Sequence, residues 1–247
     1  MRRLHNLWDG LFELLLPTRC ADCAAALPRG SSELCGVCRS RLPWLARDGC
    51  RRCQQAPPSR PGALCAACAA DASPLDACVA SVAFNGQVES WIHRFKYPVR
   101  GPSGLDPGLF ALLGELAADA AARAPGPLPD LLVPVALHPH RLRRRGFNPA
   151  MWIASRIANS TGVRCAPHAL RRLRDTPSQT GLDRRQRRRN VAGAFGCPGD
   201  VSLPHCVWLI DDVVTTGSTL SEAARALRRR GARRVVGICL ARTLWTR

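Results

Sequence analysis

The sequence predicts an α/β protein, a parallel sheet flanked by helices, with a small metal-binding domain at its N-terminus. Three observations support this fold class. Apolar runs alternate with amphipathic stretches of helical period across residues 73–247, one apolar run (207–210) ends in two adjacent carboxylates before a hydroxyl-rich turn, and the first 68 residues contain four Cys-x-x-Cys pairs. Alternating strands and helices favour a parallel sheet with right-handed crossovers, and paired cysteines indicate a metal-held segment.

The domain organisation follows from length and composition. A chain of 247 residues holds one sizeable core and a small satellite domain. Composition changes to Ala, Asp, Ser and Pro near residue 72, so we place an N-terminal helix and a double zinc ribbon in 1–72 and the α/β domain in 73–247. The helix is expected from apolar residues at helical spacing, namely Leu4, Leu7, Trp8, Leu11, Phe12 and Leu15. It is expected to pack on the protein itself, with peripheral membrane contact as the alternative.

The cysteine pairs form an internal repeat, because each pair begins fifteen residues after the previous one. Four thiolates in a tetrahedral shell suit a structural zinc ion, and these Gly-, Pro- and Ala-rich stretches are too short to build a core of their own. We therefore predict two structural Zn²⁺ ions, the first held by Cys20, Cys23, Cys35 and Cys38 and the second by Cys50, Cys53, Cys65 and Cys68. Each Cys-x-x-Cys pair is hereafter called a knuckle. A cross-braced arrangement, in which each zinc ion is held by alternate knuckles, remains open, and an iron–sulfur cluster is the main chemical competitor of zinc.

The stretch Val207–Thr219 has the chemistry of a ribose-phosphate site. Ligands of parallel α/β sheets lie beyond the carboxyl ends of the strands, where helix N-termini offer N–H groups to a phosphate. Carboxylates repel phosphate but accept hydrogen bonds from vicinal sugar hydroxyls, which is the use we expect for Asp211 and Asp212. The phosphate would be held by the hydroxyls of Thr215, Thr216, Ser218 and Thr219 and by the backbone at Gly217.

The remaining elements follow from apolar periodicity. Expected strands are 78–84, 130–137, 207–210 and 235–240, and expected helices are 87–97, 107–123, 149–159 and 220–230. In the helix 87–97 one apolar face is formed by Val88, Trp91, Ile92 and Phe95. Lys96 ends this helix and is the only lysine, so it is either a phosphate ligand or a solvated helix-end residue. Five further cysteines (Cys78, Cys165, Cys197, Cys206 and Cys239) lie among apolar residues and are predicted to be structural thiols.

Charge is the strongest compositional signal. The formal net charge is +18, and between Arg141 and Asn190 fourteen arginines face two acids. Such a balance favours polyanionic partners, although a genome biased toward Arg, Ala, Pro and Gly codons produces a similar excess. We expect residues 171–195 to form either a mobile flap with a short helix or a surface ordered by an anion, and residues 138–148 to form a basic loop that suits a second phosphate group. His138 and His140 in that loop are predicted to be solvated.

Location is predicted from what the sequence lacks. Apolar runs are well short of the roughly 20 residues of a membrane span, and Asp9 and Glu13 interrupt the only stretch that resembles a secretory signal. Reduced cysteine knuckles are typical of cytosolic metal-binding proteins. The expected location is therefore the cytoplasm.

The stretch 207–219 resembles the signature of the type I phosphoribosyltransferases, which bind 5-phosphoribosyl 1-pyrophosphate (PRPP) with Mg²⁺. By this resemblance, Asp211 and Asp212 are the catalytic pair that holds the ribose hydroxyls. The resemblance also implies a PRPP loop formed by Val213, Val214, Thr215, Thr216, Gly217, Ser218 and Thr219. Pyrophosphate or nucleic acid would be bound by Arg143, Arg144, Arg145 and Arg187.

Four features in order resemble the ComF family of competence proteins and its GntX-type relatives. They are the cysteine knuckles, Arg145-Gly146-Phe147-Asn148 after a Val-Pro strand, Gln179 followed by Arg187, Asn190 and Phe195, and the stretch 211–219. The resemblance implies a type I phosphoribosyltransferase fold with an N-terminal double zinc ribbon, and a role in DNA uptake during natural transformation. Single-stranded DNA and other competence proteins are the implied partners. The alternative is a non-catalytic zinc-ribbon protein that binds single-stranded DNA and keeps the PRPP loop as a sensor or scaffold.

Overall fold

A computed structural model describes residues 19–28, 33–55, 63–98, 106–176, 183–199 and 202–244. The chain divides into two compact units, Met1–Leu42 with Pro98–Glu115 and Pro43–Tyr97 with Leu116–Arg247. The helix expected over residues 4–15, and Gln179, lie outside the described residues. This division places the second cysteine group in the same unit as the sheet. A domain boundary after residue 72 stays a prediction.

The first unit contains a short helix, α2 (Gly36–Ser40), and the first part of α5 (Pro107–Ala122). Arg39, in the last turn of α2, pairs with the carboxylate of Glu115 in α5. The carboxylate of Asp106 accepts a hydrogen bond from the Leu109 backbone N–H at 3.0 Å, which satisfies one of the unpaired donors at the start of α5.

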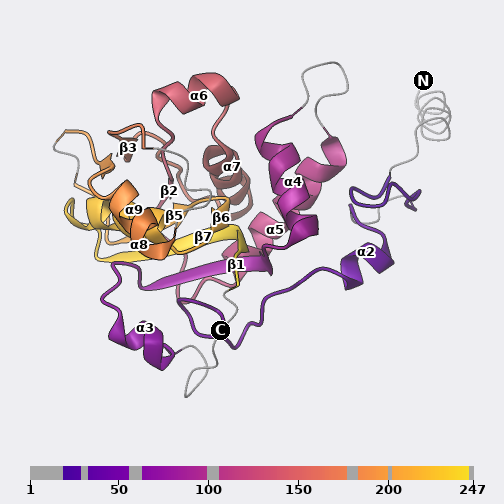
Figure 1. Ribbon diagram of the computed structural model, residues 1–247, viewed down its shortest axis with the longest axis horizontal. Coiled ribbons are helices and arrows are strands. Elements are labelled where there is room, and N and C mark those ends of the chain that lie inside the picture. Colours follow the sequence, from indigo (N-terminus) through magenta and orange to yellow (C-terminus); the bar gives the residue numbers. More distant parts are fainter. Residues whose placement is uncertain are drawn as a thin grey trace. The chain divides into compact units, whose positions relative to one another are not determined.

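The second unit is built on a parallel sheet (Figure 1). Its strands are β1 (Ala77–Ala83), β2 (Leu131–Pro134), β5 (Cys206–Ile210), β6 (Val213–Val214) and β7 (Arg234–Arg242). The order is β1-β7-β5-β2, with β6 continuing beside the end of β7, and every pairing among these strands is parallel. All residues of β1, β2 and β5 are buried, which is why these strands are continuous apolar runs in the sequence. The predicted α/β class with a parallel sheet is confirmed.

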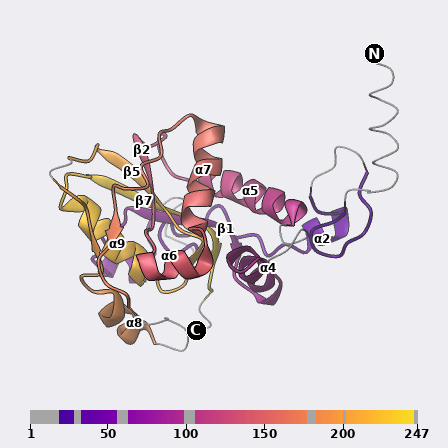
Figure 2. The ribbon, with the colours of Figure 1, turned by 90° about the horizontal axis from the view of Figure 1, so that it is seen from above.

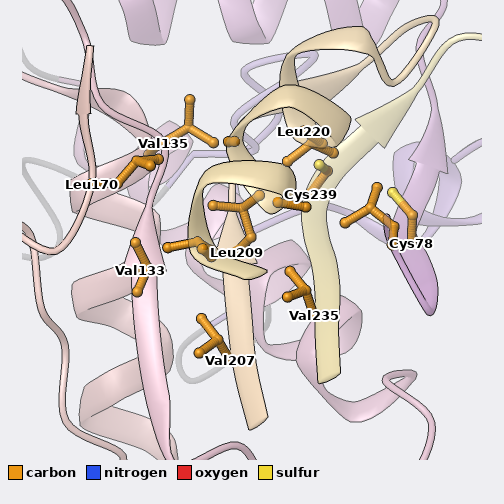
Figure 3. Close-up of a cluster of buried hydrophobic side chains, with 14 of the residues drawn as sticks. Cys78, Val133, Val135, Leu170, Val207, Leu209, Leu220, Val235 and Cys239 are labelled. Carbon is orange, nitrogen blue, oxygen red and sulfur yellow. The ribbon is translucent and has the colours of Figure 1, made fainter. Parts of the chain in front are cut away.

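Helices cover both faces of the sheet. Helix α9 (Ser218–Arg228) lies on one side of the strands and α7 (Pro149–Thr161) on the other (Figure 2). Figure 3 shows the α9 side, where Leu220 of α9 lies near Cys239 of β7, and Val207 and Leu209 of β5 belong to the same buried cluster. Because alternate residues of a strand face opposite ways, the buried Trp208 and Ile210 point to the other face.

The remaining elements of this unit are short, except for α4. Helix α4 (Gly86–Lys96) buries Val88, Trp91, Ile92 and Phe95, as predicted. The others are α3 (Ala66–Ala70), α6 (Pro139–Arg145), α8 (Arg184–Val191) and the antiparallel pair β3 (Arg171–Arg172) and β4 (Phe195–Gly196). Among the helices that the structure describes, none has both the length and the apolar character needed to cross a bilayer.

Two predictions need correction. The helix after the acidic pair begins at Ser218 rather than Leu220, because Gly217 takes the N-cap position in the left-handed region (φ 74°). The stretch expected as a basic loop contains α6, which ends at Gly146 with φ 87°. His140 is exposed, as predicted, and its Nδ1 also lies 3.0 Å from an oxygen of Asp175. The short helix expected in the arginine-rich flap is confirmed as α8.

The predicted structural thiols are mostly buried. Cys78, Cys206 and Cys239 are buried, whereas Cys165 and Cys197 are half-buried. Cys78 and Cys239 lie near each other on the neighbouring strands β1 and β7 (Figure 3).

Candidate functional site: an acidic pair, a hydroxyl-rich loop and two cysteine centres

The acidic pair lies at the carboxyl end of β5, beside β7. The Asp211 N–H donates to the Ile238 carbonyl at 3.0 Å, and the Asp212 carbonyl accepts from the Leu240 N–H at 3.0 Å. These bonds fix both residues at the edge of the sheet where parallel α/β proteins bind ligands. Asp212 is buried and Asp211 half-buried.

Lys96 neutralises part of this acidic charge. Its Nζ lies 2.8 Å from Asp212 Oδ2, and both side chains are largely shielded from water. From the sequence, Lys96 was expected to be either a phosphate ligand or a solvated residue at a helix end. In the structure it contacts the Asp212 carboxylate instead. Sequence gives no direct signal for this pair, because the two residues come from distant elements that meet only in the folded sheet.

Asp211 has an unusual pKa. Burial, followed by the neighbouring charge of Asp212, raises the pKa of Asp211 to about 7, while the positive charges of Lys96 and Arg172 oppose the rise. Desolvation and like charge both disfavour an ionised carboxylate. Perturbed carboxyl groups of this kind are concentrated at functional sites.

The loop that follows the acidic pair is hereafter called the phosphate loop, residues 213–219. Gly217 adopts φ 74° and ψ 5° and begins α9 without a side-chain cap hydrogen bond. The hydroxyls of Thr216 and Ser218 lie 2.8 Å apart. The loop therefore presents several hydroxyl groups and the positive end of the α9 dipole, which together form a site suited to an anion.

One predicted arginine reaches the phosphate loop directly. Arg187 Nη1 donates to Thr215 Oγ1 at 2.8 Å. Arg187 is held on α8 by a capping box, in which Asp183 Oδ1 accepts from the Gln186 N–H at 2.8 Å and Gln186 Oε1 accepts from the Asp183 N–H at 2.8 Å. The predicted residues Asp211, Asp212, 213–219 and Arg187 are thus brought together.

The other three predicted arginines lie on α6. Arg145 Nη2 donates to the Tyr97 hydroxyl at 3.1 Å, and its guanidinium lies 5.1 Å from the centre of the Tyr97 ring. This contact lowers the pKa of Tyr97. Arg143 and Arg144 are exposed. Tyr97 follows Lys96, so the end of α4 contacts both the acidic pair and α6.

Arg172 is a further cation of the site that sequence reasoning did not single out. It is buried, its Nη2 donates to Thr176 Oγ1 at 2.6 Å, and its guanidinium lies 5.2 Å from the centre of the Phe195 ring. Burial lowers the pKa of Arg172, whereas Asp211 lies close enough to raise it. Nothing in the sequence distinguishes Arg172 from its arginine neighbours.

The first cysteine centre groups Cys20, Cys23, Cys35 and Cys38, whose sulfurs all lie within 4.8 Å of one another. The sulfurs of Cys23 and Cys35 are 3.8 Å apart. Four sulfurs placed about 2.3 Å from one zinc ion lie about 3.8 Å apart in a tetrahedron. The donor set and its spacing therefore fit a structural zinc ion.

The second centre groups Cys50, Cys53, Cys65 and Cys68 in the same way. The sulfurs of Cys53 and Cys65 are 3.8 Å apart, and the Cys65 N–H points at the Cys50 sulfur from 3.3 Å. Burial acts to raise the pKa of Cys50, but backbone donors from Cys53 and Cys65 outweigh it and lower the pKa to about 6. Both centres pair their knuckles sequentially, so the cross-braced alternative is wrong. The two centres fit the two predicted zinc ions.

Comparison with known proteins gives a family and several relatives. The family model of the double zinc ribbon domain matches residues 11–69. The chain is 32% identical over 233 residues to the DNA utilization protein YhgH of Salmonella typhi, covering 94% of this chain and 100% of that protein. It is 28% identical over 218 residues to competence protein F of Haemophilus influenzae, covering 87% of this chain and 86% of that protein.

Among solved structures, the chain is similar to a purine phosphoribosyltransferase from Pyrococcus horikoshii Ot3. The identity is 21%, the match covers 56% of this chain and 72% of that chain, and the TM-score is 0.29.

Proposed function

Because the chain belongs to the ComF family, which includes the DNA utilization protein YhgH and competence protein F, we propose that it binds PRPP or a related ribose 5-phosphate and acts in DNA uptake. One observation carries the ligand proposal: the acidic pair and the phosphate loop adjoin at the carboxyl end of β5. The expected location is the cytoplasm. Other competence proteins are proposed as partners.

The roles of the residues follow from their chemistry. Asp211 and Asp212 accept hydrogen bonds from the 2′ and 3′ hydroxyls of the ribose. The hydroxyl groups and N–H groups of the phosphate loop bind the 5′-phosphate. Arg187, which already contacts Thr215, and Arg143, Arg144 and Arg145 on α6 supply positive charge for the pyrophosphate.

Mg²⁺ bound together with PRPP would supply positive charge to the pyrophosphate group. If transfer to a nitrogen acceptor occurs, the chain contributes mainly by positioning the ribose and by stabilising charge. Asp211 and Asp212 orient the sugar, and the arginines stabilise the departing pyrophosphate. The transferase activity is therefore proposed without a side-chain nucleophile.

Isothermal titration with PRPP and Mg²⁺ tests the ligand proposal. We expect saturable heat with the wild-type chain and at least about tenfold weaker binding after Asp211→Asn with Asp212→Asn, because each lost charged hydrogen bond contributes roughly 1.5–3 kcal/mol. The matched control is Asp48→Asn, which changes an exposed carboxylate elsewhere in the same unit. Absence of heat with the wild-type chain, or equal affinities for the double variant and wild type, contradicts the proposal.

Single-stranded DNA is the second proposed ligand, and the exposed arginines of α6 and α8 support it. Arg143 and Arg144 on α6, and Arg185 and Arg189 on α8, are exposed. If all four neutralise phosphates of a single strand, log affinity falls against log salt with a slope of about −3. In the non-catalytic alternative, this surface is the functional site and the phosphate loop serves as sensor or scaffold.

Mobility shifts of a labelled single strand at several salt concentrations test this second ligand. Replacing these four arginines with alanine should weaken binding and flatten the salt slope, whereas Arg229→Ala with Arg233→Ala, two exposed arginines beyond the far end of α9, should leave both unchanged. Lack of binding at low salt rules the second ligand out.

A further inference from the structure

Arg242 connects the second cysteine centre to the sheet from inside the protein. It is buried at 3% exposure near the end of β7. Its Nη2 donates to the Arg52 carbonyl at 3.1 Å and to the Cys78 carbonyl at 2.9 Å, and its Nε donates to Gln54 Oε1 at 3.3 Å. Arg52 lies between the ligands Cys50 and Cys53, so one guanidinium holds the first knuckle of this centre against β1.

Gln54 strengthens the same junction. Its side-chain amide forms a two-bond pair with the backbone of Ala80 in β1, donating to the carbonyl at 3.1 Å and accepting from the N–H at 2.8 Å. The Gln54 backbone has φ 56°, a conformation that a non-glycine residue rarely adopts. Its N–H donates to the Cys50 carbonyl at 2.7 Å. The residue after the knuckle is therefore held in an uncommon conformation that places its side chain on β1.

Arg242 also belongs to the backbone ladder that carries the phosphate loop. Val214, the second residue of that loop, is the register partner of Arg242, and Val213 is the partner of Ala241. The Thr243 N–H donates to the Val214 carbonyl at 2.9 Å. Arg242 thus forms hydrogen bonds to the zinc knuckle through its side chain, and its backbone pairs with the strand that begins the phosphate loop.

The space between the knuckle and the loop is not filled by packing. A cavity of about 270 Å³ has Cys53 and Cys68 of the second centre and Thr216 and Gly217 of the phosphate loop among its lining residues. The loop therefore lacks a packed support on this side. The β6–β7 pairing and the bonds of Arg242 supply a mechanical link between the two sites.

We propose that Arg242 is a positioning residue through which the second zinc site holds the phosphate loop in its binding conformation. Zinc fixes the Cys50–Cys53 knuckle, the knuckle fixes the Arg242 side chain, and Arg242 fixes the strand end on which β6 is paired. The first zinc site belongs to the other compact unit, and its loss should leave the loop unchanged. Any effect of Arg242 on ligand affinity rests on the proposed ribose-phosphate function, whereas its effect on the conformation of the loop does not.

Amide hydrogen exchange over residues 211–219 is the primary test, comparing Arg242→Met with Arg234→Met. Arg234 lies at the opposite end of β7 and donates to the Pro125 carbonyl, so it is a matched control on the same strand. We expect exchange about tenfold faster in Arg242→Met, within the usual range of coupling between sites, and no change in Arg234→Met. Equal exchange in Arg242→Met and wild type, or equal acceleration in both variants, overturns the proposal.

Zinc release provides a second arm. Coupling is reciprocal, so ribose 5-phosphate should slow the loss of the second zinc to a colorimetric chelator. A full-length variant with Cys20→Ser and Cys23→Ser isolates that zinc. In this background Arg242→Met should abolish the protection. Arg242→Lys keeps the positive charge but lacks the branched guanidinium with its several N–H donors, so it should retain part of the protection. Protection that persists undiminished in Arg242→Met contradicts the link.

The two proposals fail in different ways. If the wild-type chain does not bind ribose 5-phosphate, the proposed function fails, and the exchange of residues 211–219 still decides the coupling. If the ligand binds and the exchange of Arg242→Met equals that of wild type, only the coupling fails. Should Arg242→Met not fold, Arg242→Lys is measured by the same exchange experiment.

Discussion

At the scale of single residues, the site contains a carboxyl group whose ionisation is disfavoured by its surroundings. Asp211 follows a wholly buried strand and has Asp212 as its neighbour, and these two causes raise its pKa to about 7. Near neutral pH the Asp211 side chain therefore divides between an acid and a carboxylate. Only the carboxylate is a full acceptor for two sugar hydroxyls, so the residue that best suits the ligand is also a source of instability.

Asp211→Asn should stabilise the protein at alkaline pH. The pKa of Asp211 is raised on folding, so the folded state binds a proton more tightly than the unfolded state. The stability that this group contributes is present at low pH and is lost as pH rises through 7. We expect a gain on the order of 1–2 kcal/mol in the free energy of unfolding at pH 8.5 and little gain at pH 4. Urea unfolding at the two pH values measures it, and an equal effect at both would contradict the assignment.

Lys96 should control the pH at which the ligand binds. Lys96 opposes the rise in the pKa of Asp211 and lies 2.8 Å from Asp212. Lys96→Met should therefore raise the pKa of Asp211 and move the midpoint of ribose 5-phosphate binding to higher pH. Lys96→Arg keeps the cation and should resemble wild type. Because the ligand phosphate also titrates near pH 6, the profiles are compared with that of Asp211→Asn, and an unchanged midpoint in Lys96→Met would argue against this role.

At the scale of elements, the backbone at Gly217 determines where α9 begins. Gly217 takes φ 74°, and a Cβ there would meet only Val214 Cγ2, at 3.9 Å. Its requirement is therefore conformational rather than steric. A residue with a side chain in this region costs about 1 kcal/mol.

Gly217→Ala should lower the free energy of unfolding by about 1 kcal/mol and weaken ligand binding, because the first turn of α9 would shift. Gly86→Ala is the matched control, because Gly86 also lies at the start of a helix, as the first residue of α4. Gly86 has open space around it and no positive φ, so alanine there should be neutral or slightly stabilising. Urea unfolding of both variants decides, and equal losses would show that the φ of Gly217 carries no such cost.

Some of the helices and strands could be predicted from the sequence and others could not. Strands buried on both faces and the apolar face of α4 follow directly from periodicity, and so does the acidic pair at a strand end. Helix α6 could not be predicted, because its Arg-rich sequence has no apolar face and its ends depend on His138 and Gly146. The contact of Lys96 with Asp212, like the burial of Arg172, depends on which elements meet in the fold, and no local pattern encodes it.

At the scale of the whole molecule, the two metal centres belong to different compact units. The first lies in the unit Met1–Leu42 with Pro98–Glu115, and the second lies in the unit that contains the sheet. In the second unit, the knuckle backbone is bonded to β1 and β7 through Gln54 and Arg242. Loss of the second metal should therefore affect the sheet, while loss of the first should remain local.

Selective loss of each zinc ion should separate these effects. Metal analysis of the intact chain should give two zinc ions, and Cys20→Ser with Cys23→Ser should give one. That variant should keep the main thermal unfolding transition within a few degrees of wild type. Cys50→Ser with Cys53→Ser should lower the same transition by well over about 5 °C, because metal binding contributes directly to folding. Equal shifts for the two variants would contradict this division.

The central claim is that the acidic pair and the phosphate loop form a ribose 5-phosphate site. The most direct measurement is a crystal structure of the full chain soaked with PRPP and Mg²⁺. It should show the 5′-phosphate on the N–H and hydroxyl groups of residues 215–219, and the 2′ and 3′ hydroxyls on Asp211 and Asp212. A ligand bound elsewhere, or an empty loop at saturating PRPP with the site accessible in the crystal, would contradict the claim.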